Sequence, residues 1–114
     1  MKTIDKYRLG KMIIEGKEYK YDLIIDSSGV NQSWWRKEGH KLQIDDIKAI
    51  LERQPDVLII GTGHYGGMEV PEEVKEQINR MGIYLYVDRS QRAVEVYNSM
   101  LGYNNIIAAF HLSC

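Results

Sequence analysis

The sequence has only one cysteine, Cys114, so no disulfide can form within its 114 residues. It has no apolar run near the roughly 20 residues that a membrane-spanning helix needs, and no apolar signal core at its start. Lys and Arg number 15 against 16 Asp and Glu, so neither sign of charge dominates. This balance argues against a broad surface for nucleic acid or anionic membrane. With a single thiol and no export signal, the cytoplasm is the expected location.

Length and composition favour one globular domain over residues 1–114. Apolar residues make up 44% of the chain and charged residues 27%, which is ordinary for a globular protein with a conventional core. The sequence has only two prolines, and four of its ten glycines fall between positions 61 and 67. That glycine cluster is the most unusual local feature of the chain.

The stretch 55–67 organises our interpretation of the whole chain. The apolar residues Val57 to Ile60 stand between Pro55 and the glycine cluster. A short apolar run bounded in this way predicts a strand that is buried on both faces. The glycines predict a backbone that bends sharply or lies close to another group. We refer to residues 61–67 as the glycine loop.

Apolar periodicity predicts that helices and strands alternate after residue 42. Two right-handed crossovers would make the three strands of this half parallel. The expected elements are a helix over 44–51, a strand over 57–60, a helix from Pro71 to a cap at Gly82, a strand over 83–87, a helix from the N-cap Ser90 to Gly102 and a strand over 106–112.

The first part of the chain predicts an antiparallel hairpin over Gly10 to Asp26, with a turn at 15–17. On its second strand we expect one face to carry Tyr19, Tyr21, Leu23 and Ile25. Residues 33–36 are a candidate short strand. The predicted fold is therefore a three-layer α/β domain around a mixed sheet, with an N-terminal antiparallel hairpin and a C-terminal parallel βαβαβ half.

The glycine loop formally fits the pattern G-x-G-x-x-G after a strand, and Asp88 ends the next strand. Two features disfavour dinucleotide binding. The helix is expected near Pro71, several residues too late, and the chain is too short for both halves of a dinucleotide fold. No Gly-Lys-Ser/Thr follows, which excludes a P-loop. The loop is thus either a tight structural turn or a different kind of site.

Ligands of open α/β sheets lie beyond the carboxyl ends of the parallel strands, where the glycine loop is expected. Backbone N–H groups of the loop and of the helix start at Ser90 can receive an anion. Arg89 would add a mobile cation, and the inward-facing Asn98 would hold the loop from beneath. The candidate anion or ligand site comprises Gly61, Thr62, Gly63, His64, Arg89, Ser90 and Asn98.

Two further groups of residues have both a functional and a structural interpretation. Trp34, Trp35 and Arg36 form a candidate partner surface through stacking or recognition, and packing in the core or its rim is the alternative. His111 and Cys114 have the spacing of two metal ligands, but no second pair exists, and we predict no metal site. A Cys–His nucleophile would need a rigid thiol, and we expect residues 113–114 to be loosely held and dispensable for folding.

Several short segments form a distinctive set along the chain: Gly10-Lys11-Met12, Trp35-Arg36, Ile60-Gly61 with Gly63, Val70-Pro71, Gly82-Ile83, Ala93-Val94, Tyr97-Asn98 and Phe110-His111-Leu112-Ser113-Cys114. Together they resemble a known family of small α/β domains. It includes the adipogenesis-associated protein of animals, a mitochondrial complex I assembly factor and many prokaryotic proteins, and the chain looks most like the adipogenesis-associated branch. The chain departs from that branch at Thr62, where the branch has a basic residue, and at Arg89, where it has a polar one.

The resemblance implies a compact three-layer α/β fold and no established enzymatic activity. The residues themselves offer no clear acid–base pair, nucleophile–base set or metal cluster. We therefore predict a non-enzymatic cytoplasmic binding or assembly-type domain without a cofactor. The alternative is a small enzyme or metabolite-binding protein with an anion site at the glycine loop. Expected partners are a small anion or a protein, with no nucleic acid and no membrane, and the chain is expected to be a monomer or weak homo-oligomer.

Overall fold

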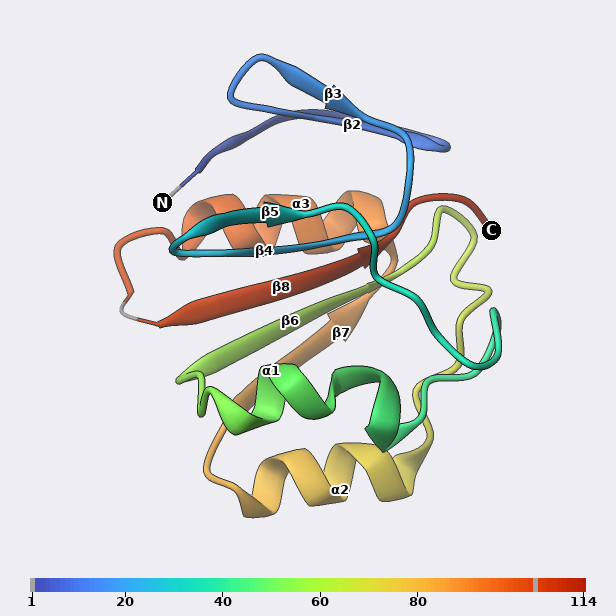
Figure 1. Ribbon diagram of the computed structural model, residues 1–114, viewed down its shortest axis with the longest axis vertical. Helices are drawn as coiled ribbons and strands as arrows, with labels where there is room; N and C mark the ends of the chain where they lie inside the picture. Colours follow the sequence, from blue (N-terminus) through green and yellow to red (C-terminus); the bar gives the residue numbers. More distant parts are fainter. Residues whose placement is uncertain (1, 104) are drawn as a thin grey trace.

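Two β-sheets form the framework of the protein in the computed structural model, which describes residues 2–103 and 105–114 (Figure 1). Sheet A is antiparallel, with the order β1 (Ile4–Arg8), β2 (Lys11–Ile14) and β3 (Lys17–Tyr19). Sheet B has five strands in the order β5 (Gly29–Asn31), β4 (Leu23–Asp26), β8 (Ile106–His111), β6 (Val57–Thr62) and β7 (Tyr84–Asp88).

The second half of the chain alternates strands and helices as predicted. Strand β6 pairs in parallel with both β7 and β8, so that Ile59 lies between Tyr86 and Ala108. Strand β4 adds to β8 in the antiparallel direction, which makes sheet B mixed. The helices of this half are η1 (Ile44–Ile47), α1 (Lys48–Glu52), α2 (Glu72–Arg80) and α3 (Ser90–Ser99).

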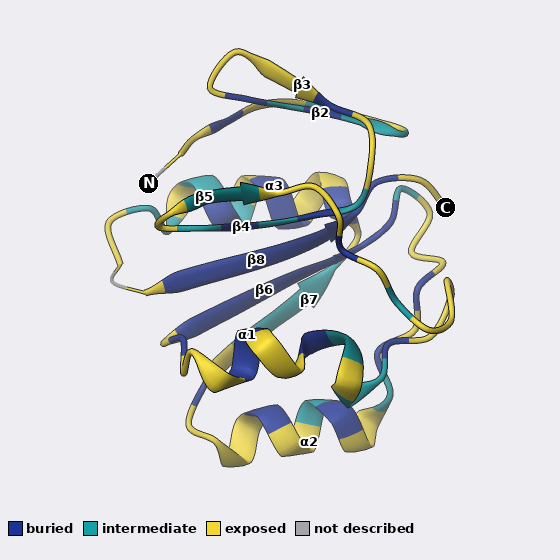
Figure 2. Cartoon of the chain, viewed as in Figure 1, coloured by how far each residue is buried: buried dark blue, intermediate teal, exposed yellow. Residues whose placement is uncertain are grey.

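Both faces of sheet B are covered, which gives the predicted three layers. Val57 and Ile59 point into a core shared with α3 and sheet A, whereas Leu58 and Ile60 point into a second core under α1 and α2. This alternation follows from the two-residue period of a strand. All residues of β6 and β8 are buried, and Figure 2 shows both strands as a dark blue centre between the layers. The prediction of a central strand buried on both faces is confirmed.

The predicted N-terminal hairpin is divided between the two sheets. Strands β2 and β3 do form a hairpin, but the chain then crosses at residues 20–22 and continues as β4 in sheet B. Tyr19 and Leu23 are buried, whereas Tyr21 is 71% exposed because it lies on the crossing segment. The single apolar face predicted through Tyr21 is therefore wrong. Strand β1 was not predicted, and residues 33–36 form no strand.

Helix ends differ from the predictions by one to three residues. Pro71 occupies the N-cap position of α2, and Gly82 follows its C-cap residue with a positive φ of 78°, the conformation that favours glycine at a helix end. Helix α3 begins at Ser90 itself, with Arg89 in the N-cap position, and it ends before Gly102. Ser90 is therefore not a cap, and its hydroxyl is free to bond outside the helix.

Candidate functional site

Both candidate regions lie at the same end of the molecule. Strands β6 and β8 run in parallel and end together, and the loops over 32–43, 63–71 and 112–114 gather beyond their carboxyl ends (Figure 1). This is the edge at which open α/β sheets hold ligands.

Buried Ser90 joins the glycine loop to β8 and α3. Its hydroxyl donates to the carbonyl of His111 (2.6 Å) and accepts from the N–H of Gly63 (3.0 Å), while its own N–H donates to the carbonyl of Gly63 (3.1 Å). A Cβ atom at Gly61 would lie only 2.7 Å from the Ser90 Oγ atom and from the Phe110 ring. Glycine at 61 therefore allows β6 to approach α3 closely enough for these bonds.

Three other N–H groups of the glycine loop hold residues 113–114. The N–H of His64 donates to the Ser113 carbonyl (2.6 Å), and the N–H groups of Tyr65 and Gly67 both donate to the main-chain oxygen of Cys114 (3.1 and 3.0 Å). The expectation that these two residues are loosely held is wrong. The loop does present converging N–H groups, as predicted for an anion site, but in this structure an oxygen of the same chain receives them.

Six of the seven candidate residues lie around this loop, and Asn98 does not. The Thr62 hydroxyl donates to the Asp88 carbonyl (3.1 Å), and exposed Arg89 lies beside Gly66. The amide of Asn98 instead accepts from the N–H of Ile4 (3.0 Å) and donates to its carbonyl (2.8 Å). Asn98 thus braces strand β1, and the expectation that it holds the loop from beneath is wrong.

A partly buried ionic cluster lies beside the loop, centred on Asp22 of the crossing segment. One carboxylate oxygen of Asp22 accepts from His111 Nδ1 (2.7 Å) and Arg36 Nη2 (2.8 Å), and the other accepts from the N–H of Leu112 (2.8 Å). Burial alone would raise the pKa of Asp22. The hydrogen bonds from His111, Leu112 and Arg36 outweigh that effect and hold the pKa below its usual value.

The sequence did not single out Asp22 as a site residue, and it left Arg36 either on a partner surface or packed in the core or its rim. The Arg36 side chain is only 5% exposed, and its guanidinium lies 4.7 Å from the centre of the Trp34 ring. Trp34 is also buried, and its indole N–H donates to the carbonyl of Asp46 (3.0 Å). Trp34 and Arg36 therefore pack inside the protein, as the alternative interpretation of this segment predicts. Of the predicted partner surface, Trp35 alone lies open, with 75% of its surface exposed.

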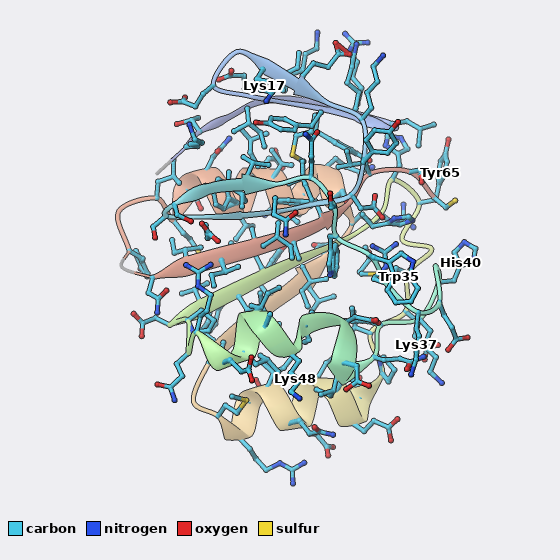
Figure 3. The ribbon with its side chains drawn as sticks, viewed as in Figure 1. Lys17, Trp35, Lys37, His40, Lys48 and Tyr65 are labelled. Atoms are coloured by element: carbon cyan, nitrogen blue, oxygen red, sulfur yellow. The ribbon has the colours of Figure 1, made fainter. Side chains whose placement is uncertain are left out.

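An open cleft of about 590 Å³ lies over Asp22. Tyr21 and Trp35, which are 71% and 75% exposed, both belong to its walls. Figure 3 shows Trp35 among the loops, at the end of the molecule that also carries Tyr65 and His40. Aromatic rings, hydroxyls and amides can hold an apolar or planar group and bond its polar edge. The residues that line the cleft are Lys20, Tyr21, Asp22, Gln32, Ser33, Trp34, Trp35 and Ser113.

Metal-ligating side chains of the described residues do not gather at this end. Within residues 2–103 and 105–114, no three His, Cys, Asp or Glu side chains are close enough to hold a metal ion. His111 uses Nδ1 on Asp22, while its Nε2 atom is buried and has no protein partner. No helix of the described residues is long and apolar enough to cross a membrane.

Residues 4–112 match the family described as "Protein of unknown function (DUF498/DUF598)", and the chain belongs to this family. Three solved structures share its fold. A conserved hypothetical protein of Pyrococcus horikoshii is 26% identical with a TM-score of 0.84, and the match covers 98% of this chain and 99% of that one. A Bartonella henselae protein described as an outer membrane protein is 23% identical (TM-score 0.79; coverage 99% and 96%). A Bordetella pertussis Mth938-like domain is 18% identical (TM-score 0.65; coverage 97% and 85%).

Proposed function

We propose that the protein is a non-enzymatic binding domain of the cytoplasm that holds a segment of a protein partner between Tyr21 and Trp35. The observation that carries this proposal is the pair of exposed aromatic side chains on the walls of one cleft. Tyr and Trp are enriched where proteins bind one another, because each supplies a large apolar contact and a polar edge. Within its family, we place the chain nearest to the adipogenesis-associated branch.

The loop that carries Trp35 is held in place by main-chain hydrogen bonds, which supports a preformed binding surface. The main-chain N–H of Trp34 donates to the Asp22 carbonyl (3.3 Å), and that of Lys37 donates to the Asp46 carboxylate (3.1 Å). Trp35 therefore stands between two anchored positions of its loop. A loop whose main chain is already held in place loses less conformational entropy on binding than a mobile loop, so more of the contact energy of Trp35 remains as affinity.

The alternative is an anion site at the glycine loop, and it has an additional cost. An external anion would compete with Ser113 and Cys114 for the N–H groups of His64, Tyr65 and Gly67. The cleft requires no such displacement, because Tyr21 and Trp35 are exposed in the structure as it stands. For this reason we favour the cleft.

A random dodecapeptide library displayed on phage, selected on the full chain, tests the proposal. Selected peptides are then synthesised, and their Kd is measured by fluorescence anisotropy. We expect Trp35→Ala and Tyr21→Ala each to weaken binding by about thirtyfold, the size of a hot-spot contact of about 2 kcal/mol. The matched control is Tyr103→Ala, because Tyr103 is 62% exposed but does not line the cleft.

The control should bind the peptides with unchanged affinity. Circular dichroism of each variant checks that the fold is retained. If no peptide is enriched, or if enriched peptides bind Trp35→Ala as tightly as the unaltered chain, the proposal is wrong.

A further inference from the structure

We infer that the cleft selects an acidic segment, with Lys20 as the residue that determines this specificity. The inference rests on the proposed function, because it names the chemistry of the partner for that same cleft. The segment would place an apolar or aromatic side chain between Tyr21 and Trp35 and a carboxylate near the Lys20 ammonium group. The charges of the described residues around the cleft lead to this partner.

The floor of the cleft offers no free negative charge. Asp22 is the only anion among the described residues that line it. Its carboxylate already accepts bonds from His111, Arg36 and Leu112, and the buried Arg36 guanidinium balances its charge. A cationic partner would therefore find no unpaired carboxylate there.

Lys20 supplies the only cation among the described lining residues, and 70% of its side chain is exposed. Its nearest carboxylate is that of Glu18 at 4.0 Å, and Glu18 is also 4.0 Å from Lys11. One negative charge is thus shared between two lysines, so one positive charge remains unbalanced at this side of the cleft. A partner carboxylate would meet attraction from Lys20 and no repulsion from the paired Asp22.

The uncharged lining residues suit the same partner. Gln32, Ser33 and Ser113 add an amide and two hydroxyl groups to the cleft. These groups donate hydrogen bonds to carboxylate or peptide oxygens and accept them from peptide N–H groups. The cleft therefore combines an aromatic clamp, neutral hydrogen-bonding groups and one cation, which together fit an acidic, extended segment rather than a basic one.

The test compares charge reversal at Lys20 with charge reversal elsewhere, on peptides selected from the phage library. Lys20→Glu and Lys48→Glu change the net charge equally, but Lys48 is an exposed residue of α1, away from the cleft (Figure 3). We expect peptides selected on the unaltered chain to be rich in Asp and Glu beside an apolar residue. Lys20→Glu should weaken them by about tenfold and Lys48→Glu by less than about twofold.

Selection repeated on the Lys20→Glu chain should enrich Lys and Arg instead of Asp and Glu. The affinity of the acidic peptides should also fall as salt is added, because the ion pair is exposed. If peptides depend on Trp35 but show no acidic excess, or lose equal affinity in both charge-reversed chains, the inference fails and the proposed function stands. If no peptide depends on Trp35, both fail.

Discussion

The Asp22 carboxylate and the His111 imidazole lie 2.7 Å apart, although 89 positions separate them in the sequence. Their contact joins the crossing between the two sheets to the end of β8. Arg36 binds the same carboxylate oxygen at 2.8 Å and brings in the loop over 32–43. Three segments that are far apart in the sequence are thus held together beneath the cleft.

Replacing Asp22 by Asn should lower the free energy of unfolding by roughly 3–5 kcal/mol, as expected when one partner of a buried ion pair is removed. The Arg36 guanidinium would remain buried without a balancing charge, and two of its nitrogens already have no protein partner. Urea denaturation of the variant measures this loss. Glu72→Gln is the control, because the Glu72–Lys75 pair is exposed and should contribute almost nothing. Equal stability of the two variants would contradict the prediction.

Above pH 10 the protein should lose stability in part through Tyr7. Burial, and then the negative charge of Asp22, raise the pKa of Tyr7 from 10.0 to about 12. Between these pH values the folded chain keeps a proton that the unfolded chain has lost, so the free energy of unfolding falls as the pH rises. Denaturation of Tyr7→Phe across this range should give a shallower fall. The Tyr7 hydroxyl also bonds the Leu112 carbonyl, so the variant should start from a lower stability at neutral pH.

Much of the fold could be predicted from the sequence, because local patterns report burial. Val57 to Ile60 are apolar without interruption, and their strand is indeed buried on both faces. Strand β1 was missed since only Ile4 of its five residues is buried, which leaves no alternation to detect. The division of the predicted hairpin was missed for a different reason. Leu23 and Ile25 show the same apolar alternation whether their strand pairs with β3 or, as observed, with β8.

The candidate site was less predictable, because its contacts are distant in sequence. Asp22, Arg36 and His111 have no common motif, and only the folded chain brings them together. The pattern around Asn98 correctly indicated a side chain that needs partners, but it could not indicate which ones. The glycine loop was identified for the right reason, close approach of the backbone, although the group that approaches it is the main chain of residues 113–114.

Deleting residues 113–114 should destabilise the protein, whereas Cys114→Ala should not. The deletion removes the oxygens that accept from His64, Tyr65 and Gly67, and each lost bond contributes about 1 kcal/mol. The alanine variant keeps the main-chain oxygen and loses only an exposed thiol. Thermal unfolding of both variants separates the contribution of the main-chain hydrogen bonds from that of the Cys114 thiol. A deletion that melts at the same temperature as Cys114→Ala would show that these bonds contribute no net stability.

Asn98→Ala should release strand β1 rather than the glycine loop. The variant loses both hydrogen bonds to Ile4 and leaves that N–H and carbonyl without partners, at a cost of about 1–3 kcal/mol. Amide hydrogen exchange locates the effect along the chain. Faster exchange is expected at Ile4 and across sheet A, while the N–H of Gly63, which is bonded to Ser90, should stay protected. Faster exchange confined to the glycine loop would contradict the structure.

Gly63→Ala should be among the most damaging small substitutions in the loop, for two separate reasons. The backbone φ at this position is +105°, where a residue with a Cβ atom is strained by roughly 1–3 kcal/mol. The new Cβ would also lie 2.5 Å from the main-chain carbon of Cys114 and 2.7 Å from the His111 ring, so residues 113–114 or the ring must move. Because that ring binds Asp22, the strain should also reach the floor of the cleft.

Gly39→Ala is the matched control for this substitution, because Gly39 has no positive φ and a Cβ there would meet no atom within 4 Å. In urea denaturation, Gly63→Ala should lower the free energy of unfolding by at least the conformational strain of roughly 1–3 kcal/mol. Gly39→Ala should leave the free energy of unfolding almost unchanged. The imidazole signals of His111 in NMR spectra should shift in Gly63→Ala alone, since its ring is the nearest side chain to the added methyl group. If Gly63→Ala is as stable as Gly39→Ala and leaves those signals unchanged, residues 113–114 do not lie against the loop as described.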